Sequence, residues 1–206
     1  MKIIDLTQTF TKDMPVYPGD PKPSLKQVAS LDKDGYNDHE IATVMHVGTH
    51  MDAPLHMIEG GKRIDEIPTD KLIGPGVLLD ARDKIEINAN ILLDRQIKKG
   101  SIVLVYTGFG IRYRTKDYFK NYPHFGNDFA EILVELGISA VGMDMLGPDL
   151  DTPWSTHKIL LGKEIMILEN LINLDQLLEE EEFEVFALPA KFKTDAAPVR
   201  VIAIIK

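Results

Sequence analysis

The sequence predicts a strand-rich α/β fold in a single domain. Short runs rich in Val, Ile and Leu recur along the chain, most of them bounded by Gly, Pro or Asp, as strands commonly are. Stretches with an apolar spacing near 3.6 residues lie between some of these runs and indicate a few helices. The 206 residues contain no obvious linker and are enough for one stable core.

The elements follow from these patterns in chain order. The expected strands are 2–7, 76–81, 101–109, 139–145, 164–170, 183–190 and 199–206. The expected helices are 88–100, which stops at Gly100, 127–137, which has Asn127 or Asp128 as its cap, and 171–180. Residues 11–23 are dense in Pro and Gly, which predicts an ordered extended loop of the kind that often covers a site.

Composition excludes several classes of protein. A net charge of −9 would repel the phosphates of nucleic acid, so we expect no nucleic-acid partner. No apolar run reaches the roughly 18 residues of a membrane span, and the first residues lack a secretory signal, so we expect a cytoplasmic protein without a membrane partner. The chain has no cysteine, and any metal must therefore bind nitrogen and oxygen ligands.

The stretch "HVGTHMDAPLH", residues 46–56, concentrates imidazoles and a carboxylate at alternate positions. These groups are His46, His50, Asp52 and His56. A helix does not suit the stretch, because about 100° per residue would place Asp52 on the far side from His46, and Gly48 and Pro54 weaken helices. In an extended segment, alternate side chains share one face. We therefore expect an extended segment at least through Asp52, with Pro54 ending the regular strand.

Such a face favours a divalent cation such as Zn²⁺, Mn²⁺ or Fe²⁺. A hydrogen-bonded polar face without metal is the alternative. Three protein ligands would leave an open coordination position, which is typical of catalytic metal sites. His39, His124 and His157, together with carboxylates such as Glu169 at the end of an expected strand, are candidates for a second ion, although each taken alone is more often structural.

The same stretch resembles the H-x-G-T-H-x-D-x-P-x-H signature of the cyclase family of metal-dependent hydrolases, which includes bacterial kynurenine formamidase and isatin hydrolase. The resemblance extends over most of the chain, including "IDLTQTFTKDMPVYPGDP", "AVGMDMLGPD", "THKILLGKEIMILENLINL" and "LPAKFKTDAAPVRVIAI". It implies a swivelling β/β/α fold and a homodimer or homotetramer.

The resemblance also implies roles for individual residues. His46, His50 and Asp52 would bind a first ion, and Asp52 would bridge to a second ion held by His157 and Glu169. His56 would be the catalytic acid–base residue. The cofactor would be Zn²⁺ or Mn²⁺, with one or two ions per subunit.

The expected reaction is hydrolysis of a small amide. N-formylkynurenine, cleaved to kynurenine and formate by an arylformamidase, is the first candidate, and isatin or another small amide or lactone is the alternative. Tyr17, Trp154 and Phe109 are expected to pack against an aromatic substrate, unless they serve only core or interface packing. Relatives often carry Trp in place of Tyr17 and Phe in place of Met57, which leaves the substrate open. A metal-dependent lyase or isomerase, or a non-enzymatic metal-dependent binder of small molecules, remains a competing hypothesis.

Overall fold

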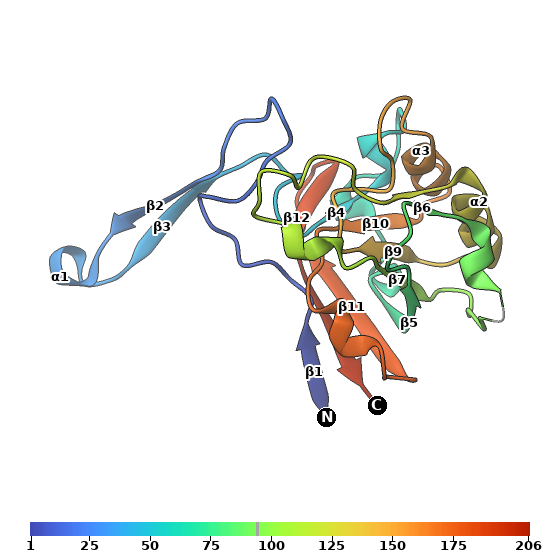
Figure 1. Ribbon diagram of the computed structural model, residues 1–206. Helices are drawn as coiled ribbons and strands as arrows, with labels where there is room; N and C mark the ends of the chain where they lie inside the picture. The colour runs from blue at the N-terminus through green and yellow to red at the C-terminus, as the bar shows by residue number, and fades with distance from the viewer. Residues whose placement is uncertain (94) are drawn as a thin grey trace.

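A computed structural model describes residues 1–93 and 95–206. Its largest sheet has eight strands in the order β1-β12-β11-β5-β7-β9-β10-β4 (Figure 1). Because β12 also pairs with β4, seven of these strands close into a barrel and β1 extends the sheet beyond it. The strands are β1 (Lys2–Asp5), β4 (His50–Asp52), β5 (Ile73–Asp80), β7 (Ile102–Tyr106), β9 (Ala140–Met143), β10 (Met166–Glu169), β11 (Phe183–Pro189) and β12 (Ala196–Ile205).

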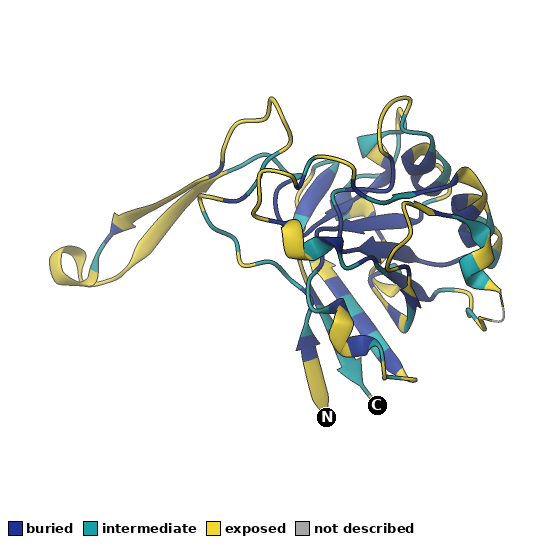
Figure 2. Cartoon of the chain, in the orientation of Figure 1, coloured by how far each residue is buried: buried dark blue, intermediate teal, exposed yellow. Residues whose placement is uncertain are grey.

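The centre of this sheet is parallel and buried on both faces. Strands β5, β7, β9 and β10 run parallel, whereas β4, β11, β12 and β1 pair antiparallel. In β7, Val103 and Val105 join one apolar cluster while Ile102 and Leu104 join another on the opposite face. This alternation explains the continuous apolar runs of the sequence, because parallel strands with both faces covered carry apolar residues at every position. Figure 2 shows β9 and β10 as buried. β7 is buried except at Tyr106, whereas most of β5 is half-buried or exposed.

Two helices cover one face of the parallel strands. They are α2 (Asn127–Leu136) and α3 (Ser155–Leu161), and they pack against each other. Phe129, Leu133 and Leu160 are fully buried in the same cluster as Val103. The predicted helix 127–137 is confirmed, and it ends where Gly137 adopts a left-handed conformation with φ of 65°. Among the described residues, no helix combines the length and the apolar character that crossing a bilayer requires.

Two other predicted helices are wrong. Within 88–100, only Ala89–Leu92 forms a short 3-10 turn, η4, and residue 94 lies outside the described residues. The Ala89 amide donates to the Asp128 carboxylate at the start of helix α2, which ties the beginning of this turn to that helix. Within 171–180, only Leu174–Leu177 forms a 3-10 turn, η6, because Asn173 has a φ of 58° and interrupts the backbone. Tertiary contacts and a local left-handed residue override the apolar spacing at these places.

All seven predicted strands are present with somewhat different ends. The remaining short elements connect the barrel. They are η1 (Pro54–His56), η2 (Ile64–Glu66), η3 (Thr69–Lys71), η5 (Phe109–Arg112) and the small parallel pair of β6 (Glu86–Ile87) and β8 (His124–Phe125). Residues 11–23 carry no helix or strand, in agreement with the predicted extended loop.

A hairpin arm projects from the barrel and was not expected from the sequence. It consists of β2 (Ser24–Ala29) and β3 (Asp38–Ala42), with the one-turn helix α1 (Leu31–Asp34) at its tip. Figure 1 shows the arm extending away from the rest of the molecule, and Figure 2 shows that nearly all of it is exposed. Exposed apolar side chains run along the arm, namely Leu25, Val28, Leu31, Tyr36 and Ile41.

Candidate metal centre

The barrel brings histidines and carboxylates together where β4 lies between β10 and β12. In the register of the sheet, His50 is paired with Glu169 of β10, so their side chains share one face. Asp52 is paired with Ala196 at the start of β12. The distance from His50 Nε2 to Glu169 Oε2 is 3.3 Å. Strand pairing therefore joins two predicted site residues that are far apart in the sequence.

The predicted extended segment is only partly correct. Regular strand structure covers His50–Asp52, whereas residues 45–49 bend and Gly48 has a φ of 72°. Side chains rarely adopt such a φ, and a Cβ atom at Gly48 would also lie 2.7 Å from the Met14 Cε atom, so this bend favours glycine. The bend directs His46 back toward the strand, where its Nδ1 atom lies 2.9 Å from Asp52 Oδ1. His46 thus joins the cluster through a turn of the backbone and not through alternation along one strand.

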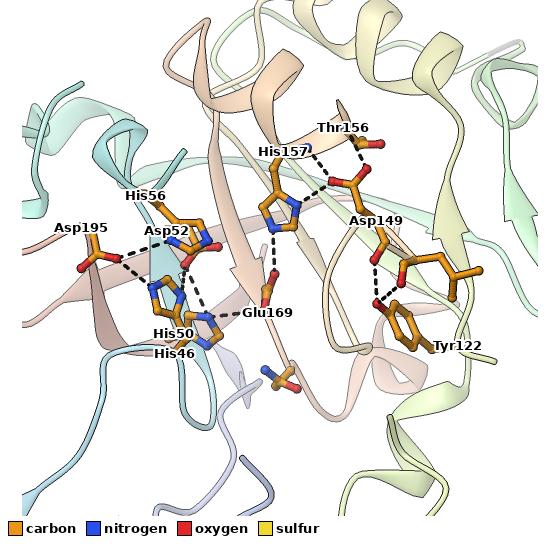
Figure 3. Close-up of polar contacts among 12 residues, drawn as sticks. His46, His50, Asp52, His56, Tyr122, Asp149, Thr156, His157, Glu169 and Asp195 are labelled. Atoms are coloured by element: carbon orange, nitrogen blue, oxygen red, sulfur yellow. Dashed lines mark hydrogen bonds and ion pairs between the residues drawn. The ribbon is translucent and has the colours of Figure 1, made fainter. Parts of the chain in front are cut away.

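His56 reaches the same cluster by a second change of direction. Pro54 starts the 3-10 turn η1, which ends at His56, as expected from a proline that ends the strand. The ring centroid of His56 lies 4.1 Å from that of His46 and 5.8 Å from that of His157 (Figure 3). His56 therefore stands between the two ends of the cluster.

Polar atoms at the centre of the cluster are buried without hydrogen-bond partners. These atoms are His50 Nε2 and both carboxylate oxygens of Asp52. His50 Nε2 lies 3.4 Å from Asp52 Oδ1, and His46 Nδ1 is closer still, yet neither is aligned for a hydrogen bond. Ligand atoms that are 2.0–2.2 Å from one ion lie about 3–3.5 Å from each other. The unpaired atoms and their spacing fit a divalent cation, since burying them without one is costly.

Each of the three histidines predicted to bind metal also has a hydrogen-bond acceptor for its second ring nitrogen. His50 Nδ1 donates to the Gly48 carbonyl oxygen over 2.9 Å, which leaves Nε2 free. His157 Nδ1 lies 2.6 Å from Asp149 Oδ2, and His46 Nε2 lies 2.9 Å from Asp195 Oδ2. Metal-binding histidines almost always donate their second N–H in this way, which orients the ring. The surroundings of the cluster therefore fit the same interpretation as its centre.

His157 and Glu169 form the second end of the cluster. His157 Nε2 lies 3.5 Å from Glu169 Oε1, and Glu169 spans the distance between His157 and His50 (Figure 3). Asp149 fixes this end, because it accepts the backbone amides of Thr156 and His157 in addition to the imidazole. His39 lies on the exposed arm and His124 on β8, so neither of these candidates belongs to the groups that converge here.

The charges of the cluster favour a cation. Burial lowers the pKa values of His46 and His157, but neighbouring carboxylates raise them to about 10 and about 9, with Asp52 acting on the first and Asp149 on the second. Burial raises the pKa of Asp52, yet His50 and His46 hold it well below its usual value. His56 differs, because burial lowers its pKa and the neighbouring imidazoles add to that shift. His56 is therefore largely neutral at pH 7 and able to accept a proton.

A cavity of about 420 Å³ opens beside these groups. Tyr17 and Asp20 from the loop of residues 11–23 contribute to its wall, together with Met57, Leu146 and Trp154. Of the residues predicted to contact substrate, Tyr17 and Trp154 line the cavity. Phe109 does not: it is buried in the core against the rings of Tyr118 and Tyr122, which corrects that prediction.

Sequence reasoning missed two carboxylates of the site. Asp195 contacts His46 and His56, and Asp149 contacts His157. Neither residue stands at a spacing that relates it to a histidine, and the tertiary structure alone brings them close.

A strand-rich α/β barrel that gathers imidazoles and carboxylates beside a cavity has the architecture of a metal-dependent hydrolase. The chain belongs to the cyclase family, since the family model described as "Putative cyclase" matches residues 4–150. Kynurenine formamidase of Bacillus anthracis is 29% identical over 205 residues, which cover 98% of this chain and 96% of that protein.

Solved structures agree with this membership. Isatin hydrolase A from Labrenzia aggregata, bound to benzyl benzoate, has a TM-score of 0.89 and 28% identity, and covers 99% of this chain and 93% of its own. A structure described as "Potential Metal-Dependent Hydrolase With Cyclase Activity" has a TM-score of 0.80 and 31% identity, over 100% of this chain and 98% of its own. The chain is accordingly a hydrolase of this family that depends on a divalent metal.

Proposed function

We propose that this chain is an arylformamidase that hydrolyses N-formylkynurenine to kynurenine and formate. The observation that carries the proposal is the convergence of His46, His50, Asp52, His157 and Glu169 beside a cavity that His56 also lines. The resemblance to kynurenine formamidase over nearly the whole chain supports the formamide as substrate. Isatin or another cyclic amide is the second candidate, supported by the likeness to isatin hydrolase A.

We assign His46, His50 and Asp52 to a first ion and His157 and Glu169 to a second, with Asp52 placed to serve both. The nitrogen and oxygen donors suit Zn²⁺ or Mn²⁺. A bound divalent cation supplies Lewis acidity, which polarises a carbonyl group and makes water more acidic. His50, Asp52 and Glu169 are all buried and their ligand atoms lie close together, so we expect the two ions to share this buried centre, with Asp52 between them.

His56 is the acid–base residue of the proposal. Its lowered pKa keeps it neutral at neutral pH, so it is ready to take a proton from the attacking water. The same imidazole then gives a proton to the departing nitrogen, which is needed because an amine leaves poorly as an anion. Its place between His46 and His157 keeps it close to both metal-binding ends of the cluster.

The lining of the cavity favours N-formylkynurenine over an anionic substrate. Tyr17, Trp154 and Met57 offer surface for an aromatic ring. Asp20 offers a carboxylate, whereas none of the described residues that line the cavity is Lys or Arg. The aryl ring and the ammonium group of N-formylkynurenine are complementary to this combination, whereas its carboxylate meets no Lys or Arg among the described residues that line the cavity.

A hydrolysis screen tests the proposal. Formamides, lactams and lactones are offered to protein stripped of metal and then supplied separately with Mn²⁺ or Zn²⁺. We expect metal-dependent formate release from N-formylkynurenine at a higher kcat/KM than ring opening of isatin. Faster opening of isatin would support the second candidate. Metal binding without turnover of any compound would support the non-enzymatic binder, and elimination or isomer formation would support a lyase or isomerase.

We also infer that the protein forms a homodimer or homotetramer. A two-stranded hairpin with no packing partner is marginally stable in water, and the arm exposes Leu25, Val28 and Ile41. A second copy of the chain is the partner that this inference assigns to the arm. A cytoplasmic location remains a prediction, which fractionation of cells would test.

A further inference from the structure

Asp195 is held firmly in place next to the cluster. It directly precedes β12, and its backbone oxygen accepts the Ala53 amide over 2.9 Å. The following residue, Ala196, pairs with Asp52 in the sheet. The backbone of Asp195 is therefore fixed against the end of β4, next to Asp52 of the metal cluster.

One oxygen of Asp195 contacts two imidazoles (Figure 3). Its Oδ2 atom lies 2.9 Å from His46 Nε2 and 3.4 Å from His56 Nδ1. Because a carboxylate oxygen only accepts, both of these ring nitrogens carry the proton that faces it. His46 is thereby turned with Nδ1 toward Asp52, and His56 keeps Nε2 free.

We propose that Asp195 is a positioning residue that orients His46 toward the metal and His56 toward the substrate at the same time. The proposal deepens the proposed function and rests on it for the role of His56. A carboxylate that served only as a surface ion pair for His46 would leave the orientation of His56 unaffected. The second contact, from the same oxygen, is what distinguishes the two possibilities.

The two contacts predict two separate effects of Asp195→Ala. Loss of the partner of His46 should weaken Zn²⁺ binding by about 10–100-fold, as measured by competition with a chelator. Loss of the partner of His56 should lower kcat by about 10²-fold or more with little change in KM, because acid–base catalysis depends on the orientation of the ring. Asp195→Asn keeps the shape and one neutral acceptor, so its effects should be smaller in both measurements.

The tautomer of His56 can be measured by NMR, independently of enzyme activity, and reports its contact with Asp195. In Zn²⁺-loaded protein at pH 8, ¹⁵N NMR should show the wild-type His56 as the tautomer with the proton on Nδ1. In Asp195→Ala the equilibrium should shift toward the tautomer with the proton on Nε2, which predominates for histidine in water. The His56 signals are assigned by comparison with His56→Gln.

Asp65→Asn is the matched control. Asp65 also pairs through its backbone with the segment before β12, at Phe192, but its side chain contacts Arg63. This variant removes the same charge and should keep the Zn²⁺ affinity, kcat and His56 signals of the wild type.

Unchanged kcat and His56 tautomer in both Asp195 variants would overturn the proposal even if the Zn²⁺ affinity fell, because Asp195 would then serve His46 alone. Unchanged Zn²⁺ affinity in both variants would likewise overturn it, because His46 would not depend on Asp195. If Asp195→Ala does not fold, Asp195→Asn decides on the same three measurements. If the wild type hydrolyses no amide, the metal affinity and the NMR signals still test the positioning role, so failure of the proposed function is distinguishable from failure of this inference.

Discussion

At the scale of single residues, a change at His56 should affect catalysis without affecting metal binding. It lines the cavity and contacts Asp195, and its pKa is lowered by burial. We predict that His56→Ala lowers kcat by about 10²–10⁴-fold while the metal content of the purified protein stays unchanged. Formate release and elemental analysis on the same sample measure both quantities. A wild-type rate in this variant would remove His56 from the mechanism.

Protons and metal should compete for the cluster. With the pKa of His46 near 10 and that of His157 near 9, both imidazoles are protonated in metal-free protein at pH 7. A histidine must lose a proton to bind metal, so Zn²⁺ binding should release protons and its apparent affinity should rise with pH toward about 10. Calorimetry in buffers of different ionisation enthalpy measures the proton count. An affinity independent of pH between 6 and 8 would contradict the prediction.

The same pKa values set the sign of a stability effect in metal-free protein. The pKa values of His46 and His157 in the folded state lie above the usual 6.5. Their contribution to the free energy of unfolding is therefore fully present below pH 6.5 and is lost as pH rises through about 9 and about 10. Urea unfolding of chelator-treated protein from pH 6.5 to 10 should show a declining free energy of unfolding. The double variant His46→Gln, His157→Gln should flatten this decline.

At the scale of elements, the bend of residues 45–49 carries His46 of the metal cluster, and its Gly48 faces Met14 in the loop of residues 11–23. An alanine there would adopt an unfavourable φ of 72° and meet Met14 at 2.7 Å. We predict that Gly48→Ala costs about 1–3 kcal/mol of unfolding free energy. Because His46 lies within the bend, two residues before Gly48, this variant should also weaken Zn²⁺ binding. Gly60→Ala is a control with similar φ and open space around it, so it should cost stability but leave metal binding unchanged.

The arm gives a prediction about assembly. Leu25 and Ile41 are paired across β2 and β3 and are both exposed, so we expect them to pack on a second copy. Leu25→Glu with Ile41→Glu should convert the oligomer into a monomer of 23.1 kDa while the circular dichroism of the barrel stays the same. Light scattering after size-exclusion chromatography measures the mass. A wild-type protein that is already monomeric at micromolar concentration would contradict the inferred assembly.

An element could be predicted from the sequence where local residue patterns determine it, and could not where distant contacts do. The apolar runs of β7 and β10 reveal strands because burial on both faces needs no distant information. Helix α2 was readable from its spacing and its glycine stop. Helix α3 was not, because it is short and Trp154 before it has a φ of 59°. The arm was not either, because its exposed strands mix polar and apolar residues without a clear period.

At the scale of the whole molecule, some site residues could be predicted from the sequence and others could not. His46, His50 and Asp52 could be predicted from one stretch, and the family resemblance related them to His157 and Glu169. The physical reason that these groups meet is long-range, because β10 pairs with β4 across more than a hundred residues of chain as part of the closed barrel. Asp149 and Asp195 lie in stretches that carry the family resemblance, but their spacing gives no physical reason to relate them to a histidine, since single carboxylates in loops become site residues through tertiary contacts.

Metal should also stabilise the folded barrel as a whole, since ions held by ligands from β4, β10 and α3 bind only the native arrangement. Zn²⁺ at about 100 times its Kd should add about 2.7 kcal/mol to the free energy of unfolding. A rise in Tm on adding Zn²⁺, reversed by a chelator and absent in His50→Ala, is the expected result. An equal rise in that variant would indicate binding elsewhere.

The most direct test of the metal centre is anomalous diffraction from crystals grown with Mn²⁺ or Zn²⁺. We predict an anomalous peak within about 2.0–2.3 Å of His50 Nε2 and an Asp52 oxygen, with His46 Nδ1 completing the set. Full occupancy of the ligand side chains without any anomalous peak among them, at millimolar metal, would contradict the account.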